Sequence, residues 1–468
     1  MTGDGDGVVT GEISPAAALE ARLRSISPAE SPDQWALAAY RLAVALGEDS
    51  SPDRELSLHQ AAQLLERAAR LLDAQRAPIE HARILNAAGA TWRALGNTSQ
   101  AVDSFAAAAA LLSGRARDGE IGSVLSNLGL AQLERGDGAA ALKTFDDALG
   151  VLRRALTASS GPQEKRAFAS AALNRAQALL ALPDGTLPDA ALPDAALPDC
   201  VLRDGHAMGW GPDASTAAIS TVEEGLAVSS IADAPLQVGM LRHTLGLIRM
   251  RADQPDAARD DFTSALAVFT RSSFPFQHAI ANFNRGRASE QAGDLRGALV
   301  DYETAAQLFD PRLHRDQWHE AATRLANVER QLMETFPDAT RSDHIVGLLA
   351  DANSAARLAM LRERIGQLWT RAPDVARAEL RQLAQAAIRL SLEARDEVLR
   401  ATIEVFMELP DEVLRSGLQA QLDAHAALPE PERLAADRRF DTAIQELVMG
   451  PQRVRMRDIL YETGWERP

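Results

Sequence analysis

Residues 85–108 read LNAAGATWRALGNTSQAVDSFAAA, and residues 125–148 follow the same pattern as LSNLGLAQLERGDGAAALKTFDDA. In both stretches a Gly precedes a Gly-containing turn, and an Ala then precedes a Phe by four positions. Gly89 and Ala101 are 12 positions apart, as are Gly129 and Ala141. Because residues three and four apart share one face of a helix, each stretch predicts two helices joined by a short turn.

A second spacing, of 28 positions, joins one helical pair to the next. It runs from Ala61 to Gly89, Ala101 to Gly129, Ala218 to Gly246, Ala258 to Gly286, and Ala298 to Ala326. The spacings of 12 and 28 add up to a 40-residue repeat. A fixed period of this length indicates stacked helical hairpins, and therefore an all-α solenoid rather than the core of a globular enzyme.

The recurring small and aromatic residues have a packing reason. Gly or Ala at a helix crossing lets two backbones approach closely. The aromatic residue one turn after the second Ala, such as Phe105, fills the space between hairpins. Turns at 96, 136, 253 and 293 contain Gly, Asp or Asn, which are residue types that close a helical hairpin.

This pattern resembles the tetratricopeptide repeat, since several positions recur together in register. The units are longer than usual for that family, and are similar to the extended repeats of kinesin light chains, spindle-orientation adaptors and bacterial peptide-sensing regulators. The resemblance covers roughly two-thirds of the chain. It implies a right-handed superhelical solenoid in which the first helix of each hairpin lines a concave groove.

The spacings divide the chain into parts. Residues 1–30 have no lasting periodicity, and we expect a disordered, acidic and Gly-rich tail. Residues 31–335 are expected to form the solenoid, with about six repeats and a capping helix at 315–334. Near-identical Leu-Pro-Asp pentapeptides occupy 186–200, where a Pro at every fifth position forbids helix, and they predict a disordered insertion over about 183–213.

Residues 344–468 lose the repeat but keep the composition of helices. Prolines at 373, 410, 429 and 431 mark the helix edges. The region matches no family, and it is expected to be either a small helical bundle or irregular hairpins that extend the superhelix. The expected helices are 344–370, 374–393, 395–409, 411–427 and 432–448.

Composition limits the function classes. The net charge of −16 argues against a nucleic-acid partner, because binding phosphates requires a Lys- or Arg-rich face. No stretch approaches 18 uncharged apolar residues and the N-terminus lacks a signal peptide, so we expect no membrane partner and a cytoplasmic location. Only two of the 49 basic residues are Lys, which together with heavy use of Ala is typical of a high-GC bacterial genome.

Signals for catalysis are weak. Cys200 and His206 could be a nucleophile and its base, but nothing places a third group or an oxyanion donor beside them. His314 and His319 are five positions apart, which puts them on different faces of a helix, whereas zinc helices use a step of four. We therefore expect no enzyme, no cofactor and no metal. The alternation of Arg453, Arg455 and Arg457 could grip an acidic partner or contact this acidic chain itself.

The predicted groove offers a better candidate site. Asn127, Asn174 and Asn284 each lie two positions before a packing Gly or Ala. An Asn amide both donates and accepts, so it can pair with the backbone of an extended peptide. In the extended-repeat relatives an Asn at this position plays that role, and the resemblance implies the same here. The alternative is that each Asn bonds to a neighbouring helix or to water.

Other residues share the predicted inner face by the same register. Several are Arg, so the groove could be less acidic than the whole molecule and could suit an acidic peptide or helix. They are Asn86, Arg83, Arg93, His243, Arg251, Phe283, Arg287 and Glu290.

These observations predict a non-enzymatic module that binds a protein or extended peptide, as a scaffold, assembly factor or chaperone. The first alternative is a regulator that a peptide or metabolite switches, with the C-terminal helices transmitting the change. The second is an enzyme with an unrecognised helical site. A homodimer formed through the Leu- and Ala-rich C-terminal helices is also open.

Overall fold

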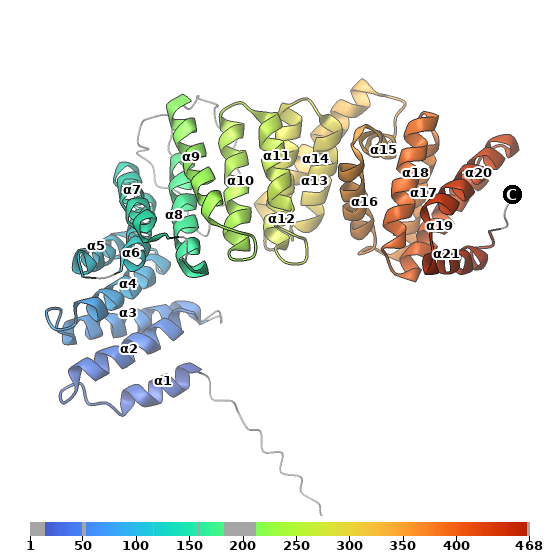
Figure 1. The fold of residues 1–468 in the computed structure, drawn as a ribbon. Coiled ribbons are helices and arrows are strands. Elements are labelled where there is room, and N and C mark those ends of the chain that lie inside the picture. Colours follow the sequence, from blue (N-terminus) through green and yellow to red (C-terminus); the bar gives the residue numbers. More distant parts are fainter. Residues whose placement is uncertain (1–14, 49–52, 116, 158–159, 182–211, 466–468) are drawn as a thin grey trace, which may run out of the picture. The chain divides into compact units, whose positions relative to one another are not determined.

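The computed structural model describes residues 15–48, 53–115, 117–157, 160–181 and 212–465, which form 21 helices and no strand (Figure 1). This confirms the all-α prediction. The chain divides into two compact units, residues 1–284 and 285–468. Helix α12, Pro275–Gln291, crosses the boundary between them.

Helical hairpins make up the first unit. Its helices are α1 Pro15–Arg24, α2 Pro32–Gly47, α3 Arg54–Leu71, α4 Pro78–Ala94, α5 Thr98–Leu112, α6 Asp118–Glu134, α7 Gly138–Ala155, α8 Pro162–Ala181, α9 Pro212–Val228, α10 Pro235–Arg251 and α11 Pro255–Leu266. Consecutive helices pair as α2 with α3, α4 with α5, and so on to α10 with α11, as Figure 1 shows. The leading helix of each pair (α2, α4, α6, α8 and α10) is here called a first helix, and each first helix also packs on the first helix of the next pair.

Each predicted turn contains a residue in the left-handed region. Gly96, Gly136 and Gly293 have φ of 74°, 93° and 81°, and Asp253 takes the equivalent place with φ of 56°. The residue after each donates its backbone N–H to a carbonyl five positions back, over 2.8–2.9 Å. This bond ends the helix in a Schellman-type turn, which explains the preference for Gly.

Glycines of the first helices lie directly against aromatic rings of the second helices. A Cβ added at Gly89 would lie 2.8 Å from the Phe105 ring, and one at Gly129 would lie 2.6 Å from Phe145. The next repeats have the same contact, from Gly246 to Phe262 at 2.6 Å and from Gly286 to Tyr302 at 2.9 Å. The Gly therefore allows the ring to fill the crossing, as the spacing predicted.

The N-terminal tail is shorter than expected. Residues 15–24 form α1, and Leu23 is buried against a cluster that includes Trp35 of α2. The expectation of disorder over residues 1–30 is therefore wrong for this helix. Residues 1–14, and the insertion from 182 to 211, lie outside the described residues.

The second unit continues after the last part of α12. Its helices are α13 Leu295–Leu308, α14 Arg315–Thr335, α15 Arg341–Asp351, α16 Ser354–Leu368, α17 Pro373–Ile388, α18 Leu392–Met407, α19 Asp411–Ala426, α20 Glu430–Leu447 and α21 Pro451–Glu462. The expected helix 344–370 is two helices, because the Asn353 side chain caps a new helix start at Ala356 N. Helix α21 was not predicted.

A second repeat runs through this unit, where we expected none. The residues that precede α16, α18 and α20 are Asn353, Ser391 and Pro429, which are 38 positions apart. In this array α16 packs on α18 and α18 on α20, while α17 packs on α19. Ion pairs follow the same step, as Arg362–Glu408 and Arg400–Glu446. The C-terminal region is thus a second array of hairpins in which alternate helices make the main contacts.

None of the helices in the described part of the chain is both long and apolar enough to cross a membrane.

Candidate functional site

Two of the predicted asparagines bond to neighbouring first helices. The Nδ2 group of Asn127 on α6 donates to Oδ1 of Asn86 on α4 over 3.1 Å. A bond of the same kind joins α12 to the first helix α10, where Nδ2 of Asn284 on α12 donates to Nε2 of His243 on α10 over 3.0 Å. Both bonds join residues 41 positions apart, so they link equivalent faces of successive repeats.

His243 and Asn284 are both buried, at 2% and 1% exposure. Burial lowers the pKa of His243 to about 4, so the ring is neutral at pH 7. Because Nε2 accepts a hydrogen bond, the proton of the neutral ring is on Nδ1. Among the described residues, this Nδ1 atom has no hydrogen-bond partner.

The third asparagine, Asn174 on α8, differs from the other two. It is half-buried, and its amide makes no hydrogen bond within the described residues. It lines a cavity of about 230 Å³ in the first unit, between α8, α10 and α12. The structure therefore brings Asn174 and His243 together at one cavity, whereas Asn86 and Asn127 lie elsewhere along the first helices.

None of the described residues that line this cavity is charged. Its apolar lining is Leu173, Leu236, Met240, Phe269, Phe276 and Ile280. Its polar lining is Ser170, Asn174, Gln237, His243 and Gln277. Such a surface combines an apolar interior with a few hydrogen-bonding groups, which is the usual character of a ligand pocket.

Sequence reasoning missed most of the apolar lining. A usable signal exists, because Leu236, Met240 and His243 are spaced i, i+4 and i+7 on α10 and so share one helix face. On α12, Gln277 and Ile280 precede Asn284 by seven and four positions. The face that carries the asparagines therefore also identifies the cavity residues.

The predicted arginines are held by acidic or carbonyl groups. Arg83 and Arg93 on α4 pair with Glu120 and Glu134 of α6, each over 2.7 Å. Arg251 donates to the carbonyl of Leu180. Glu120 and Glu134 neutralise Arg83 and Arg93, so the expected preference of the groove for an acidic ligand loses its basis on α4.

The three remaining predicted residues, Phe283, Arg287 and Glu290, lie on α12, and Glu290 accepts a hydrogen bond from the Tyr302 hydroxyl over 2.6 Å. Phe283 is buried, at 1% exposure, and so presents no surface to a ligand. Arg287 is half-buried and belongs to the second unit.

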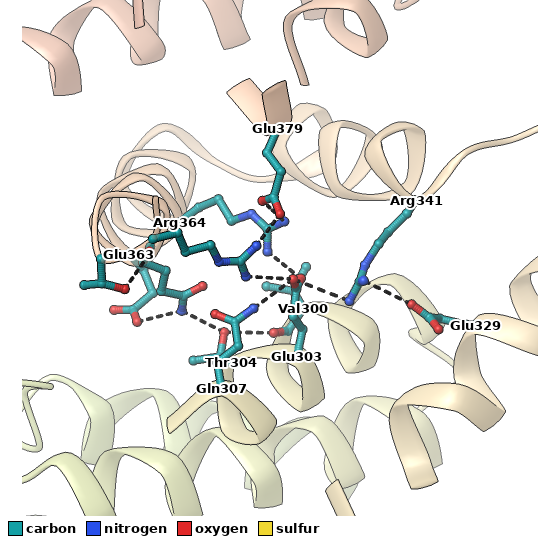
Figure 2. A network of polar contacts seen from close by, with 12 residues as sticks. Val300, Glu303, Thr304, Gln307, Glu329, Arg341, Glu363, Arg364 and Glu379 are labelled. Carbon is teal, nitrogen blue, oxygen red and sulfur yellow. Dashed lines mark hydrogen bonds and ion pairs between the residues drawn. The ribbon is translucent and has the colours of Figure 1, made fainter. Parts of the chain in front are cut away.

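The second unit contains a buried network of ion pairs centred on Glu303 of α13 (Figure 2). Glu303 is 5% exposed and contacts Arg364 of α16, as well as Arg341 at 3.4 Å and Arg371 at 3.8 Å. Gln367 of α16 donates to Thr304 over 2.9 Å. Two further carboxylates pair with the same arginines: Glu329 pairs with Arg341, and Glu379 pairs with Arg371.

This network has a structural role. Three carboxylates face three guanidinium groups, so the buried charges compensate one another. The pairs join α13 to α15, α16 and α17, and thereby fix the last hairpin of the first repeat type to the second array.

Other candidate residues also have partners in the second unit. Arg455 donates to the carbonyls of Met407 and Leu409 and pairs with Asp411 over 2.7 Å, which is the intramolecular contact that the sequence left open. Arg457 pairs with Asp458 over 3.1 Å, and Arg453 donates to a backbone carbonyl of α20.

The histidines add no second candidate site among the described residues. No group of three or more His, Cys, Asp or Glu side chains that could hold a metal occurs in the part of the chain that the structure describes. Cys200 and His206 lie outside that part.

No family model and no curated protein matches the chain. Solved structures do match it. A Rap protein complexed with Competence and Sporulation Factor is 12% identical, with 85% of this chain and 99% of that one covered and a TM-score of 0.37. The Rap conjugation gene regulator of the plasmid pLS20, in complex with the Phr* peptide, is 13% identical, with 89% and 98% covered and a TM-score of 0.36.

A third similar structure is the TPR domain of P58(IPK), which is 14% identical, with 92% of this chain and 97% of that one covered and a TM-score of 0.26. At these identities the likeness concerns the fold alone. The fold is that of helical hairpin repeats, in agreement with the spacings of Gly, Ala and aromatic residues in this chain.

Proposed function

We propose that this chain, a tetratricopeptide-repeat protein, binds an extended segment of another protein on the first helices of its first unit. In this proposal the Asn174 amide pairs with the backbone of the segment, and the adjacent cavity accepts one of its side chains. The observation that carries the proposal is the Asn174 amide, which has no hydrogen-bond partner among the described residues and lies at the edge of an uncharged, largely apolar cavity.

Physical chemistry supports this assignment. A peptide group offers one donor and one acceptor, which an Asn amide matches whatever the side chain of the peptide residue. The apolar lining then supplies affinity through burial, while the few polar groups fix the orientation. We propose that the protein acts through this binding as a scaffold, an assembly factor or a chaperone, without catalysis.

The test uses the full chain and a displayed library of random peptides as the probe. Peptides selected on the wild-type protein are synthesised, and their affinities are measured by fluorescence anisotropy. Asn174→Ala should weaken binding by about 10-fold or more, as expected when a buried hydrogen bond with the ligand is lost.

Asn127→Ala is the matched control, because it makes the same chemical change at a residue that is already bonded to Asn86. It should leave the affinity within about 3-fold of wild type. The proposal is overturned if no peptide binds, or if the two variants weaken binding equally.

A further inference from the structure

The second array repeats every 38 residues, and one of its recurring arginines lacks the bonds that its equivalent makes. Arg357 of α16 and Arg395 of α18 are 38 positions apart, and each is the fourth residue of its helix. Arg357 is buried, pairs with the carboxylate of Glu397, and donates to three backbone carbonyls around the end of α15. Arg395 is half-buried, and its guanidinium makes no hydrogen bond or ion pair with any described residue.

The sequence explains why Arg395 has no ion pair. The position 38 residues after Glu397 is Ala435 of α20, an exposed residue that has no carboxylate. Asp396, which follows Arg395 in the chain, accepts two hydrogen bonds from Arg439 over 2.8 and 2.9 Å. That carboxylate is therefore held by another cation.

The surroundings of Arg395 disfavour its positive charge. Burial and the neighbouring Arg439 both lower the pKa of Arg395. Asp437 of α20 does not compensate for this, because it accepts a hydrogen bond from the His425 ring over 2.8 Å. A bound anion would offset the cost of placing a guanidinium in these surroundings.

Arg395 also lines a cavity of about 50 Å³ in the second unit. Ala387 and Ile388, at the end of α17, belong to the same lining. In the preceding repeat the equivalent residues are Leu349 and Ala350, whose carbonyls accept hydrogen bonds from the equivalent arginine. Leucine, isoleucine and valine side chains make up most of the remaining wall. The repeat that contains Arg395 thus has a small, largely apolar space next to its guanidinium.

We propose that Arg395 and this cavity bind a small carboxylate ion of one or two carbons, formate or acetate. In the preceding repeat the group that pairs with the equivalent arginine is a carboxylate, that of Glu397. A guanidinium binds a carboxylate through two parallel hydrogen bonds, which gives the ion a fixed orientation. The apolar wall then accepts the methyl group of acetate.

The volume sets an upper limit on the size of the ion. A protein cavity of about 150 Å³ holds benzene, and this one has about a third of that volume, at about 50 Å³. It has room for a methyl group beside the guanidinium but not for an aromatic ring. Benzoate is therefore excluded, although it carries the same carboxylate.

The test compares sodium acetate with sodium chloride at equal concentration on the full chain, so that the ionic strength is the same. Acetate should raise the midpoint of thermal unfolding by about 1–3 °C in a saturable way, because a ligand that binds only the folded chain stabilises it. Formate should act like acetate, and benzoate like chloride. Saturation-transfer NMR on the methyl protons of acetate measures binding directly.

Two variants with matched controls test the residues. Arg395→Gln should abolish the acetate effect, whereas Arg433→Gln, at the exposed equivalent position of α20, should keep it. Ala435→Glu should supply the carboxylate from within the chain, so it should raise the midpoint in chloride and abolish the further effect of acetate. Ala106→Glu, the same change at an exposed helix position of the first unit, should respond to acetate like the wild type.

The inference is refuted if acetate and chloride act alike on the wild-type chain, or if benzoate acts like acetate. It is also refuted if the acetate effect persists in either Arg395→Gln or Ala435→Glu. Circular dichroism checks the fold of each variant. The comparison of salts on the wild-type chain needs no variant, and so it decides the question even where a variant does not fold.

Discussion

Single glycines decide how closely the helices of a hairpin approach. At Gly129 the nearest ring atom of Phe145 is 2.6 Å from where a Cβ would be, a distance that real Cβ contacts do not reach. Gly150 on the neighbouring helix α7 is different, because no atom lies within 4 Å of its added Cβ. The same residue type thus has opposite consequences at two sites in one hairpin.

We predict that Gly129→Ala lowers the free energy of unfolding by about 1–3 kcal/mol, through overpacking against Phe145. Gly150→Ala, in an open helix interior, should instead raise it by about 0.5–1 kcal/mol. Urea denaturation followed by circular dichroism measures both. Equal effects at the two sites would contradict the packing argument.

His243 links burial to the pH dependence of stability. Its pKa is lowered to about 4 in the folded chain, from an ordinary value of 6.5. Between these values the unfolded chain binds a proton that the folded chain does not bind. Stability is therefore complete above pH 6.5 and is lost as the pH falls towards 4.

From this difference we predict that lowering the pH from 7 to 5 costs about 2 kcal/mol of stability through His243. His243→Gln should lack this contribution, since Gln does not titrate and can still accept from Asn284 through its side-chain oxygen. For each protein, the urea midpoint is measured at pH 7 and at pH 5. The change between the two pH values in the variant is then subtracted from the change in the wild type. Subtraction is needed because His344 and His425 also have lowered pKa values. An identical pH slope for both proteins would refute the assignment.

At the scale of elements, the sequence predicted the first array well and the second poorly. The first array has a local signature, in which a Gly such as Gly129 and a ring such as Phe145 are 16 positions apart and the turn glycines have positive φ. In the second array, buried positions that are 38 residues apart carry side chains of different sizes, as Leu368, Phe406 and Ile444 show. The main contacts there join alternate helices. The period of the second array is therefore carried by caps and ion pairs rather than by a recurring small residue.

The candidate site shows a similar limit. Register placed Asn174 and His243 on the inner face, and both line the cavity. The pairing of Asn127 with Asn86 depends on the distance between two helices, which the spacing along the chain does not fix. Sequence alone therefore could not separate the bonded asparagines from Asn174.

Buried ion pairs join the elements of the second unit more tightly than exposed ones. We predict that Glu303→Ala destabilises the protein by about 3–5 kcal/mol, because Arg364, with only 9% of its side chain exposed, loses its buried partner. The control is Glu408→Ala, which removes an ion pair with Arg362 that is nearly half exposed and should cost less than about 1 kcal/mol. Thermal and urea unfolding of both variants measures the difference, and a loss of similar size in the two would contradict it.

At the scale of the whole molecule, the strong negative charge of the chain contrasts with the uncharged lining of the proposed site. The chain has a net charge of −16, whereas the lining of the cavity carries none. On the same predicted face, Arg83 and Arg93 of α4 are paired with Glu120 and Glu134, and Arg251 of α10 donates to the carbonyl of Leu180. Long-range attraction between the acidic surface and a basic ligand is screened by salt, but burial of a side chain in an uncharged cavity is not.

We therefore predict that a selected peptide of zero net charge keeps its affinity within about 3-fold between ~50 mM and ~500 mM NaCl. A scrambled peptide of the same length that carries several Lys residues is the control. Any association of that peptide with the acidic chain should weaken by about 10-fold or more over the same range, because it depends on screened charges. Fluorescence anisotropy titrations at the two salt concentrations measure both peptides. A steep loss of affinity for the neutral peptide would mean that the charged surface, and not the cavity beside Asn174, supplies the binding energy.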